Sequence, residues 1–154
     1  MNQLKGIITA IQSNGHLSLV DVSIGSDTFT SILLETPENT PWLKLNNPVE
    51  LMFKATEVAL GKNLSGMLSL RNRIPATVRG IRRGEILSEV ELDYRGQPFY
   101  SIVTTRAVER LELVVGDVVE ALVKSNEMSL REIAQEPPSS HHESRAGENG
   151  GNPS

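Results

Sequence analysis

The chain contains no cysteine, and its 154 residues include only three histidines and six aromatic side chains. Without cysteine there is no disulfide, no thiolate metal site and no cysteine nucleophile. Two of the histidines, His141 and His142, fall in a stretch dominated by polar residues near the C-terminus. Too few histidines are left for a histidine-based catalytic triad or metal site, and we expect no bound metal ion.

Long apolar runs and a strong charge of one sign are also missing. No apolar stretch approaches the ~18 residues of a membrane span, and the opening MNQLKG lacks the core of a signal peptide, so we expect a cytoplasmic protein without a membrane partner. The net charge is −4, and the first 70 residues hold no arginine. No broad basic surface for nucleic acid is indicated, so an anion would have to be held by local donors.

The motifs of the common enzyme classes are absent as well. The chain has no GxSxG, P-loop or HExxH pattern, and its carboxylates fall at strand-alternation or turn positions, so we predict that it is not an enzyme. The one basic cluster, Arg79, Arg82 and Arg83, has glutamates close by, which favours a solvated mixed-charge face. With so few aromatic residues, single-strand nucleic-acid binding is the less favoured alternative.

The strongest positive feature is an internal repeat. When the sequence is shifted by 70 positions, residues 2–60 match the second half of the chain without a gap at 14 identical positions. Phe29 falls on Phe99, and Lys54 falls on Lys124. The chain is therefore predicted to be two copies of one module of ~60 residues. The repeated phenylalanines are predicted to lie in the core.

The repeat divides the chain into four parts. They are a first module at 1–62, a connecting segment at 63–71, a second module at 72–134 and a tail at 135–154. The tail is rich in Pro, Ser, Gly and charged residues, so we expect it to be disordered. A domain of ~60 residues buries only ~60% of its unfolded surface, so we expect the two modules to pack against each other or against another chain.

Each module is predicted to hold five short strands that form its own sheet, with alternation of apolar and polar residues typical of half-buried strands. One helix, capped by a threonine, is predicted at 105–111, and at most a helical turn is predicted at 37–45. The fold class is therefore all-β with short helices, as two tandem OB-like five-stranded barrels. The predicted strands are 6–11, 17–24, 28–34, 49–54, 57–60, 76–81, 87–94, 99–103, 118–124 and 128–130.

Two segments carry donors suited to an oxyanion. Ser69-Leu70-Arg71-Asn72 offers a hydroxyl, backbone amides, a guanidinium and a carboxamide just before a strand, and Lys124-Ser125-Asn126 lies between the last two strands. The counterpart in the first module is Lys54-Ala55-Thr56. Such donors form charge-assisted hydrogen bonds to anions. Taken by itself, each segment is weak evidence, because a serine and an arginine before a strand are usually a linker and a lysine at a strand end is usually solvated.

The same segments resemble the Mop/TOBE family, whose hallmark is a Ser-x-Arg-Asn opening and a Lys-(Ala/Ser)-(Ser/Thr) near the end. The resemblance covers nearly all of residues 1–131, because each of the two modules resembles the family domain. The family includes stand-alone molybdate-binding proteins, molybdate-responsive regulators and the ends of importer ATPases. The resemblance implies a free tandem protein that stores or buffers molybdate or tungstate in the cytoplasm. It also implies a homo-oligomer, expected to be a trimer, with no organic cofactor.

The resemblance further implies where the oxyanion binds, at interfaces between modules. The implied site residues of the second module are Ser69, Leu70, Arg71, Asn72, Thr104, Lys124 and Ser125, and those of the first module are Lys54 and Ala55. The chain departs from the family pattern at Ala107, Leu34 and Pro37, and nothing like Ser-x-Arg stands before Asn2. Either the first module forms an incomplete site, or Arg71 faces Lys54 in a hybrid site.

Two other functions remain open at this point. An OB-like tandem that senses an oxyanion and contacts a partner would be a regulatory interaction module. An OB-like protein that binds single-stranded nucleic acid would require a groove of aromatic and basic residues.

Overall fold

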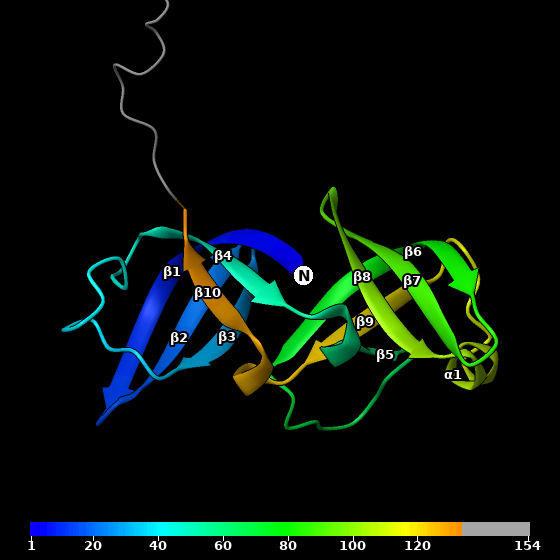
Figure 1. The fold of residues 1–154 in the computed structure, drawn as a ribbon, viewed down its shortest axis with the longest axis horizontal. Helices are drawn as coiled ribbons and strands as arrows, with labels where there is room; N and C mark the ends of the chain where they lie inside the picture. Colours follow the sequence, from blue (N-terminus) through cyan, green and yellow to red (C-terminus); the bar gives the residue numbers. More distant parts are fainter. Residues whose placement is uncertain (134–154) are drawn as a thin grey trace, which may run out of the picture.

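The computed structural model describes residues 1–133, so the predicted disordered tail and its two histidines lie outside the described residues. Two five-stranded antiparallel sheets lie side by side, as Figure 1 shows. The first contains β1 (Asn2–Asn14), β2 (Leu17–Ile24), β3 (Asp27–Leu33), β4 (Pro48–Phe53) and β10 (Ser129–Glu132). The second contains β5 (Ala59–Gly61), β6 (Asn72–Arg83), β7 (Leu87–Tyr94), β8 (Gln97–Thr104) and β9 (Val118–Val123).

Each sheet curls, as an OB-like unit requires. In β2, Ser18, Val20 and Val22 are buried while the residues between them are more exposed, which confirms the predicted alternation. The strand at one end of each sheet approaches the strand at the other end, β10 near β3 and β5 near β8. The predicted all-β fold of two five-stranded OB-like units is confirmed.

The two units repeat each other in detail. Both long strands shift register at the same place, between Ile8 and Ala10 in β1 and between Val78 and Gly80 in β6. Such a bulge bends the strand and strengthens its twist, which helps each sheet to curl. The duplication seen in the sequence is therefore also a duplication of backbone geometry.

The helix α1 (Thr105–Arg110) occurs only in the second unit. Its N-cap is Thr104, one residue before the predicted start, and the Thr104 hydroxyl accepts a hydrogen bond from the Ala107 N–H at 3.0 Å. The first unit has Leu34 and Pro37 at these two positions, so it lacks both the capping oxygen and the N–H that would be capped. Within residues 1–133 no helix combines the length and hydropathy needed to cross a bilayer.

Two single-turn 3₁₀ helices were not predicted. They are η1 (Ala55–Glu57), which follows Lys54, and η2 (Ser125–Glu127), which follows Lys124. In each the backbone N–H of the following residue closes the turn on the carbonyl of the first, as for Val58 onto Ala55. These turns begin at the lysine segments that the sequence singled out, so they decide which way those segments face.

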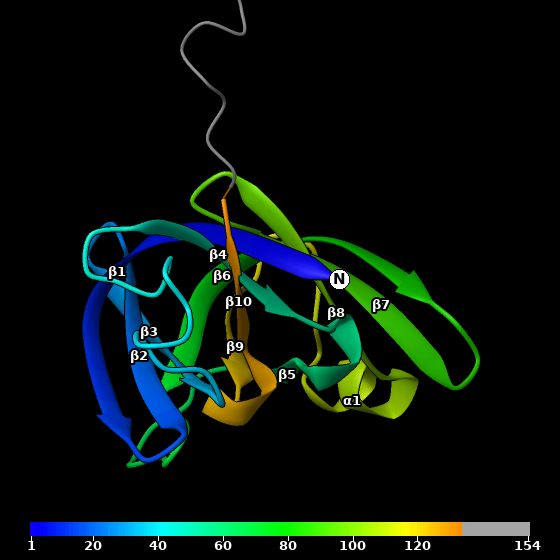
Figure 2. The same ribbon diagram turned by 60° about the vertical axis from the view of Figure 1, so that its left-hand side comes forward.

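The last strand of each module does not close its own sheet, which corrects the prediction. β5 pairs with β9 of the second unit, where Leu60 lies opposite Ala121, and β10 pairs with β4 of the first unit, where Leu130 lies opposite Leu51. Figure 2 shows both exchanged strands. Because the modules are copies, either last strand fits the edge of either sheet, and local sequence does not choose between the two pairings.

A single hydrophobic core runs through both units. Two aromatic pairs cross between them, with Phe29 of β3 against Tyr94 of β7 and Phe53 of β4 against Phe99 of β8. Both pairs are edge-to-face with ring centroids 5.8 Å apart, a favoured geometry for aromatic contacts. The predicted burial of the repeated phenylalanines is confirmed, and the modules pack against each other as expected.

Lys62 fastens the exchanged strand β5 to the second unit. Its ammonium donates to the carbonyl oxygens of Leu111 and Glu112 and to Asp117 Oδ2, each at 3.0 Å. The N–H of Val114 and the Lys62 ammonium hold the pKa of the Asp117 carboxyl below its usual value. Lys62, which the sequence assigned to the end of the first module, therefore bonds to residues of the second.

We expect Asp117→Asn to lower the free energy of unfolding at pH 7, because the ion pair with Lys62 is lost. Since the folded pKa of Asp117 lies below the unfolded value of ~3.9, the stabilisation is present at neutral pH and is lost as the pH falls through the folded pKa. Urea unfolding at pH 7 and at pH 3 measures this. Glu112→Gln is the charge-matched control, because the Glu112 carboxylate forms no ion pair among residues 1–133. An equal loss at both pH values would contradict the assignment.

Candidate oxyanion site

One cavity of about 190 Å³ lies where the two units meet, and it gathers residues from three separate parts of the chain. The connecting segment before β6 and the turn at the end of β9 supply polar groups, while β3 of the first unit supplies an apolar wall. The lining residues are Ile32, Ser69, Leu70, Arg71, Lys124, Ser125 and Asn126. Five of the nine predicted site residues therefore surround one space.

The charge of this cavity is positive. Arg71 and Lys124 both line it, and no carboxylate does. Four larger cavities of the molecule each include at least one carboxylate in their lining. Neither Arg71 nor Lys124 forms an ion pair within the described residues. Two cations without a counterion, beside hydroxyls and backbone amides, suit an anionic ligand.

The donors are accessible from outside the chain. Ser69, Arg71 and Lys124 are exposed, whereas Leu70 and Ser125 are half-buried. The cavity of the single chain is therefore open to solvent. A dianion held there still faces water on one side, so this chain does not enclose it completely.

Asn72, the fourth residue of the opening segment, lies beside the cavity but is bound elsewhere. Its Oδ1 accepts from the Thr30 N–H at 2.7 Å, and its Nδ2 donates to the Thr30 carbonyl at 2.8 Å. The side chain is fully buried. Both ends of the carboxamide are used by the β3 backbone, so Asn72 anchors the neighbouring Arg71 to the first unit.

The same contact is made a second time by the first module. Asn2 Nδ2 donates to the Tyr100 carbonyl at 2.8 Å, and Asn2 Oδ1 accepts from the Tyr100 N–H at 2.9 Å. β3 and β8 are the outer strands of their sheets, so these carboxamides pair backbone groups that would otherwise be unpaired at an edge. The repeated asparagine therefore joins the two units.

Three predicted site residues lie away from this cavity. Thr104 lines a separate cavity of about 440 Å³ beside α1, together with Glu85 and Arg106. Lys54 and Ala55 lie at the start of η1, which packs against β8. In this chain the cavity that Arg71 lines includes Lys124 and not Lys54, so the hybrid arrangement of Arg71 with Lys54 is not observed.

The site also contains a residue that sequence reasoning missed. Ile32 forms the apolar wall and was not singled out by the sequence, whereas Asn126 belongs to the donor segment that the sequence did indicate and also lines the cavity. The available signal for Ile32 was its repetition as Ile102, beside the equally repeated Ser31. An apolar residue on a strand is ordinarily interpreted as core, so this signal does not indicate a ligand site by itself.

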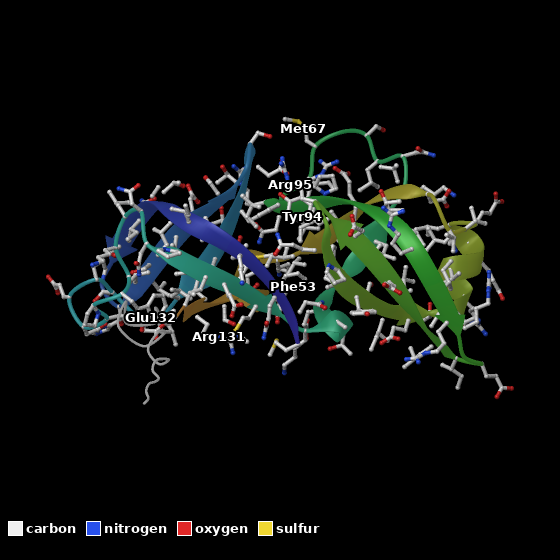
Figure 3. All side chains as sticks on the ribbon, turned by 90° about the horizontal axis from the view of Figure 1, so that it is seen from above. Phe53, Met67, Tyr94, Arg95, Arg131 and Glu132 are labelled. Carbon is white, nitrogen blue, oxygen red and sulfur yellow. The ribbon has the colours of Figure 1, made fainter. Side chains whose placement is uncertain are left out.

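A polar network fixes the other end of β3. The buried Tyr94 hydroxyl donates to Asp27 Oδ2 at 2.7 Å and accepts from Arg95 Nε at 3.2 Å, and Figure 3 shows Tyr94 beside Arg95 where the units meet. Burial, and then the bond to Asp27, raise the pKa of Tyr94 to about 12. The phenol is neutral at physiological pH. A Cβ at Gly25 would lie 2.5 Å from Arg95 Nη1, so the glycine leaves room for the guanidinium.

Two arginines of the basic cluster are paired with carboxylates. Arg82 pairs with Glu89 at 2.6 Å and Arg79 lies 3.9 Å from Asp93, which is the mixed-charge face predicted for this cluster. In the part of the chain that the structure describes, no three His, Asp or Glu residues gather as a metal site would require.

Comparisons with known proteins agree with this geometry. The TOBE domain model matches residues 68–130. The molybdenum import ATP-binding protein ModC of Brucella abortus (strain 2308) is 34% identical over 123 residues, 79% of this chain and 32% of that protein. The molybdenum transport protein ModE of Herbaspirillum seropedicae is 29% identical over 127 residues, 80% of this chain and 47% of that protein. The chain thus spans about a third to a half of these curated relatives.

A solved structure resembles the chain over almost its whole described length. It is the cytoplasmic molybdate-binding protein ModG with molybdate bound, with a TM-score of 0.79 and 30% identity over 86% of this chain and 96% of that chain. Like that structure, this chain is a tandem β-protein, in which a cavity between two OB-like units is lined by the cations Arg71 and Lys124. The chain belongs to the Mop/TOBE family of molybdate-binding domains.

We expect Asn72→Leu to lower the free energy of unfolding by about 1–3 kcal/mol, because the Thr30 N–H and carbonyl lose their partners at a buried edge. Asn2→Leu should cost a similar amount, since it breaks the equivalent pair at Tyr100. Denaturant unfolding of both variants measures this. Unchanged stability of both variants would show that the packing of the two units does not depend on these carboxamides.

Proposed function

We propose that this protein binds molybdate or tungstate in the cytoplasm, for storage or homeostasis, without a catalytic step. The observation that carries the proposal is the cavity between the two units, hereafter the seam cavity, which Arg71 and Lys124 line without any carboxylate. The residues that would bind the ion are Ser69, Leu70, Arg71, Lys124 and Ser125, while Asn72 would hold the segment in place.

The donor set suits a tetrahedral dianion. Such an ion already carries its oxygens, so it is bound through hydrogen bonds and charge rather than through metal–ligand bonds. The Ser69 hydroxyl, the Leu70 and Ser125 amides and the two cations would share its charge, because burying a charge requires several donors at once. Neither cysteine, histidine nor an organic cofactor is needed for this chemistry.

The comparisons support the choice of ion. The ModG structure, which matches the whole tandem, holds molybdate, and the two curated relatives are molybdenum transport proteins by name. These observations favour molybdate over a general anion site, and tungstate is included in the proposal as an ion of the same tetrahedral shape and charge. The regulatory and nucleic-acid alternatives gain no specific observation from the structure.

We further propose that the chain assembles as a homotrimer that covers the cavity. An apolar patch lies on the outer face of β2 and β3, at the end that includes Ile32. Its members are Leu17, Leu19, Ile32 and Leu34, which are 49%, 40%, 39% and 78% exposed. A contiguous apolar patch of this kind is typical of a protein interface. A neighbouring copy packed on it would shield the exposed side of the cavity from water.

We expect Lys124→Ala to weaken molybdate binding by about 2 kcal/mol or more, because one of two charge partners of the ion is removed. Isothermal titration calorimetry with molybdate measures this, and sulfate serves as the competing dianion. Lys54→Ala is the matched control, since Lys54 is the repeat equivalent outside the cavity. Equal affinities for molybdate and sulfate, or no heat with either, would overturn the proposed function.

We expect Leu34→Glu to convert the trimer to monomers, because a charge is then placed in the patch on β2 and β3. Native mass spectrometry reports the mass of the assembly. Met67→Glu is the control, since Met67 is 99% exposed on the connecting segment outside the patch. A wild-type protein that is monomeric at every concentration tested would overturn the proposed assembly.

A further inference from the structure

Three consecutive residues of β3 lie at or next to the cavity between the two units, and each makes a different contact. The Thr30 backbone binds Asn72, the Ser31 side chain binds Met128, and the Ile32 side chain lines the cavity. β3 belongs to the first unit, whereas every polar group at the cavity comes from the connecting segment or the second module. The strand therefore contacts, across the boundary between the two units, residues that are far from it in the sequence.

The contact of Ser31 reaches the turn that carries Lys124. The buried Ser31 hydroxyl donates to the Met128 carbonyl at 2.6 Å. Met128 closes η2, because its N–H bonds to the Ser125 carbonyl, and the Glu127 N–H bonds to the Lys124 carbonyl at 2.9 Å. The far end of this turn is thus anchored to β3, while its near end presents Lys124 and Ser125 to the cavity.

β3 is well suited to hold this turn in position. It is paired along its length with β2, where Ser31 lies opposite Val20, and its first residue, Asp27, is bound by Tyr94. Ser31 is completely buried, so its hydroxyl has no water to bond with in place of Met128. A hydrogen bond of this kind fixes geometry because the alternative is an unpaired buried carbonyl.

The other module makes an equivalent serine bond at a turn that lacks the equivalents of Arg71 and Ser125. The Ser101 hydroxyl donates to the Val58 carbonyl at 2.7 Å and so anchors η1, the turn that follows Lys54. At that seam Met1 stands at the position of Arg71, and Ala55 stands at the position of Ser125. The two serines therefore make equivalent structural contacts, but only one of them supports a turn at the cationic cavity.

We propose that Ser31 is a positioning residue of the oxyanion site, through its bond to the Met128 carbonyl. The inference rests on the proposed function and deepens it. Ser31 does not touch the ion; it holds Lys124 and Ser125 where they converge with Arg71, so that binding does not have to order the turn. Sites arranged before binding retain more of their interaction energy as affinity.

The test compares Ser31→Ala with Ser101→Ala in the full chain. Each variant loses one buried hydroxyl bond, so both should be destabilised to a similar degree in denaturant unfolding. Calorimetry should show molybdate affinity about fivefold weaker for S31A than for S101A, the effect of one lost hydrogen bond. Ser31→Thr keeps the hydroxyl and should recover most of the affinity.

The outcomes separate the two proposals. If the wild-type chain binds molybdate and S31A binds it as tightly as S101A does, Ser31 has no positioning role and the inference is wrong. If the wild-type chain binds neither molybdate nor tungstate, the proposed function fails first. Should S31A not fold, Ser31→Cys replaces it against Ser101→Cys, because a thiol keeps the volume but donates only weakly.

Discussion

The structure depends on how the open edges of two sheets are satisfied. β3 and β8 each end a sheet, and backbone groups at a buried edge need partners. Asn72 and Asn2 supply those partners with single carboxamides, and each reaches from one unit to the backbone of the other. Because this bond holds the start of β6 against β3, it also brings Arg71 to the seam. The contact that joins the two units thus also builds the cavity.

The scaffold is close to two-fold symmetric, but its chemistry is not. The asparagine pairs, the serine bonds from β3 and β8, the bulges and the exchanged strands all occur twice. The donors recur only in part, since Lys124 corresponds to Lys54 but Arg71 corresponds to Met1 and Ser125 to Ala55. Packing contacts are therefore retained in both copies, while Arg71 and Ser125 have no equivalent donor side chain in the first module.

Much of the fold followed from pattern alone. The shift of 70 residues predicted two modules, alternation predicted the strands, and the helix predicted at 105–111 starts where α1 does and ends one residue beyond it. The donor segments were also visible, because Ser69-Leu70-Arg71 and Lys124-Ser125 combine hydroxyls, amides and cations. The exchange of β5 and β10 was not predictable, since equivalent strands compete for equivalent edges. The roles of Asn72 and Ile32 could not be predicted from the sequence either, because each lies next to residues of the other unit.

The amino-acid sequence by itself determined which donor segments supply the candidate site and the nature of its scaffold. Periodicity, turn residues and donor types are local properties, and they act over a few neighbouring positions. Only the tertiary structure decided that Arg71 lines the same cavity as Lys124 rather than Lys54, that Thr104 lies beside a different cavity, and that β3 forms the wall. Those outcomes depend on which copy of a repeated strand pairs with which edge, a choice made by long-range packing between two nearly equivalent halves.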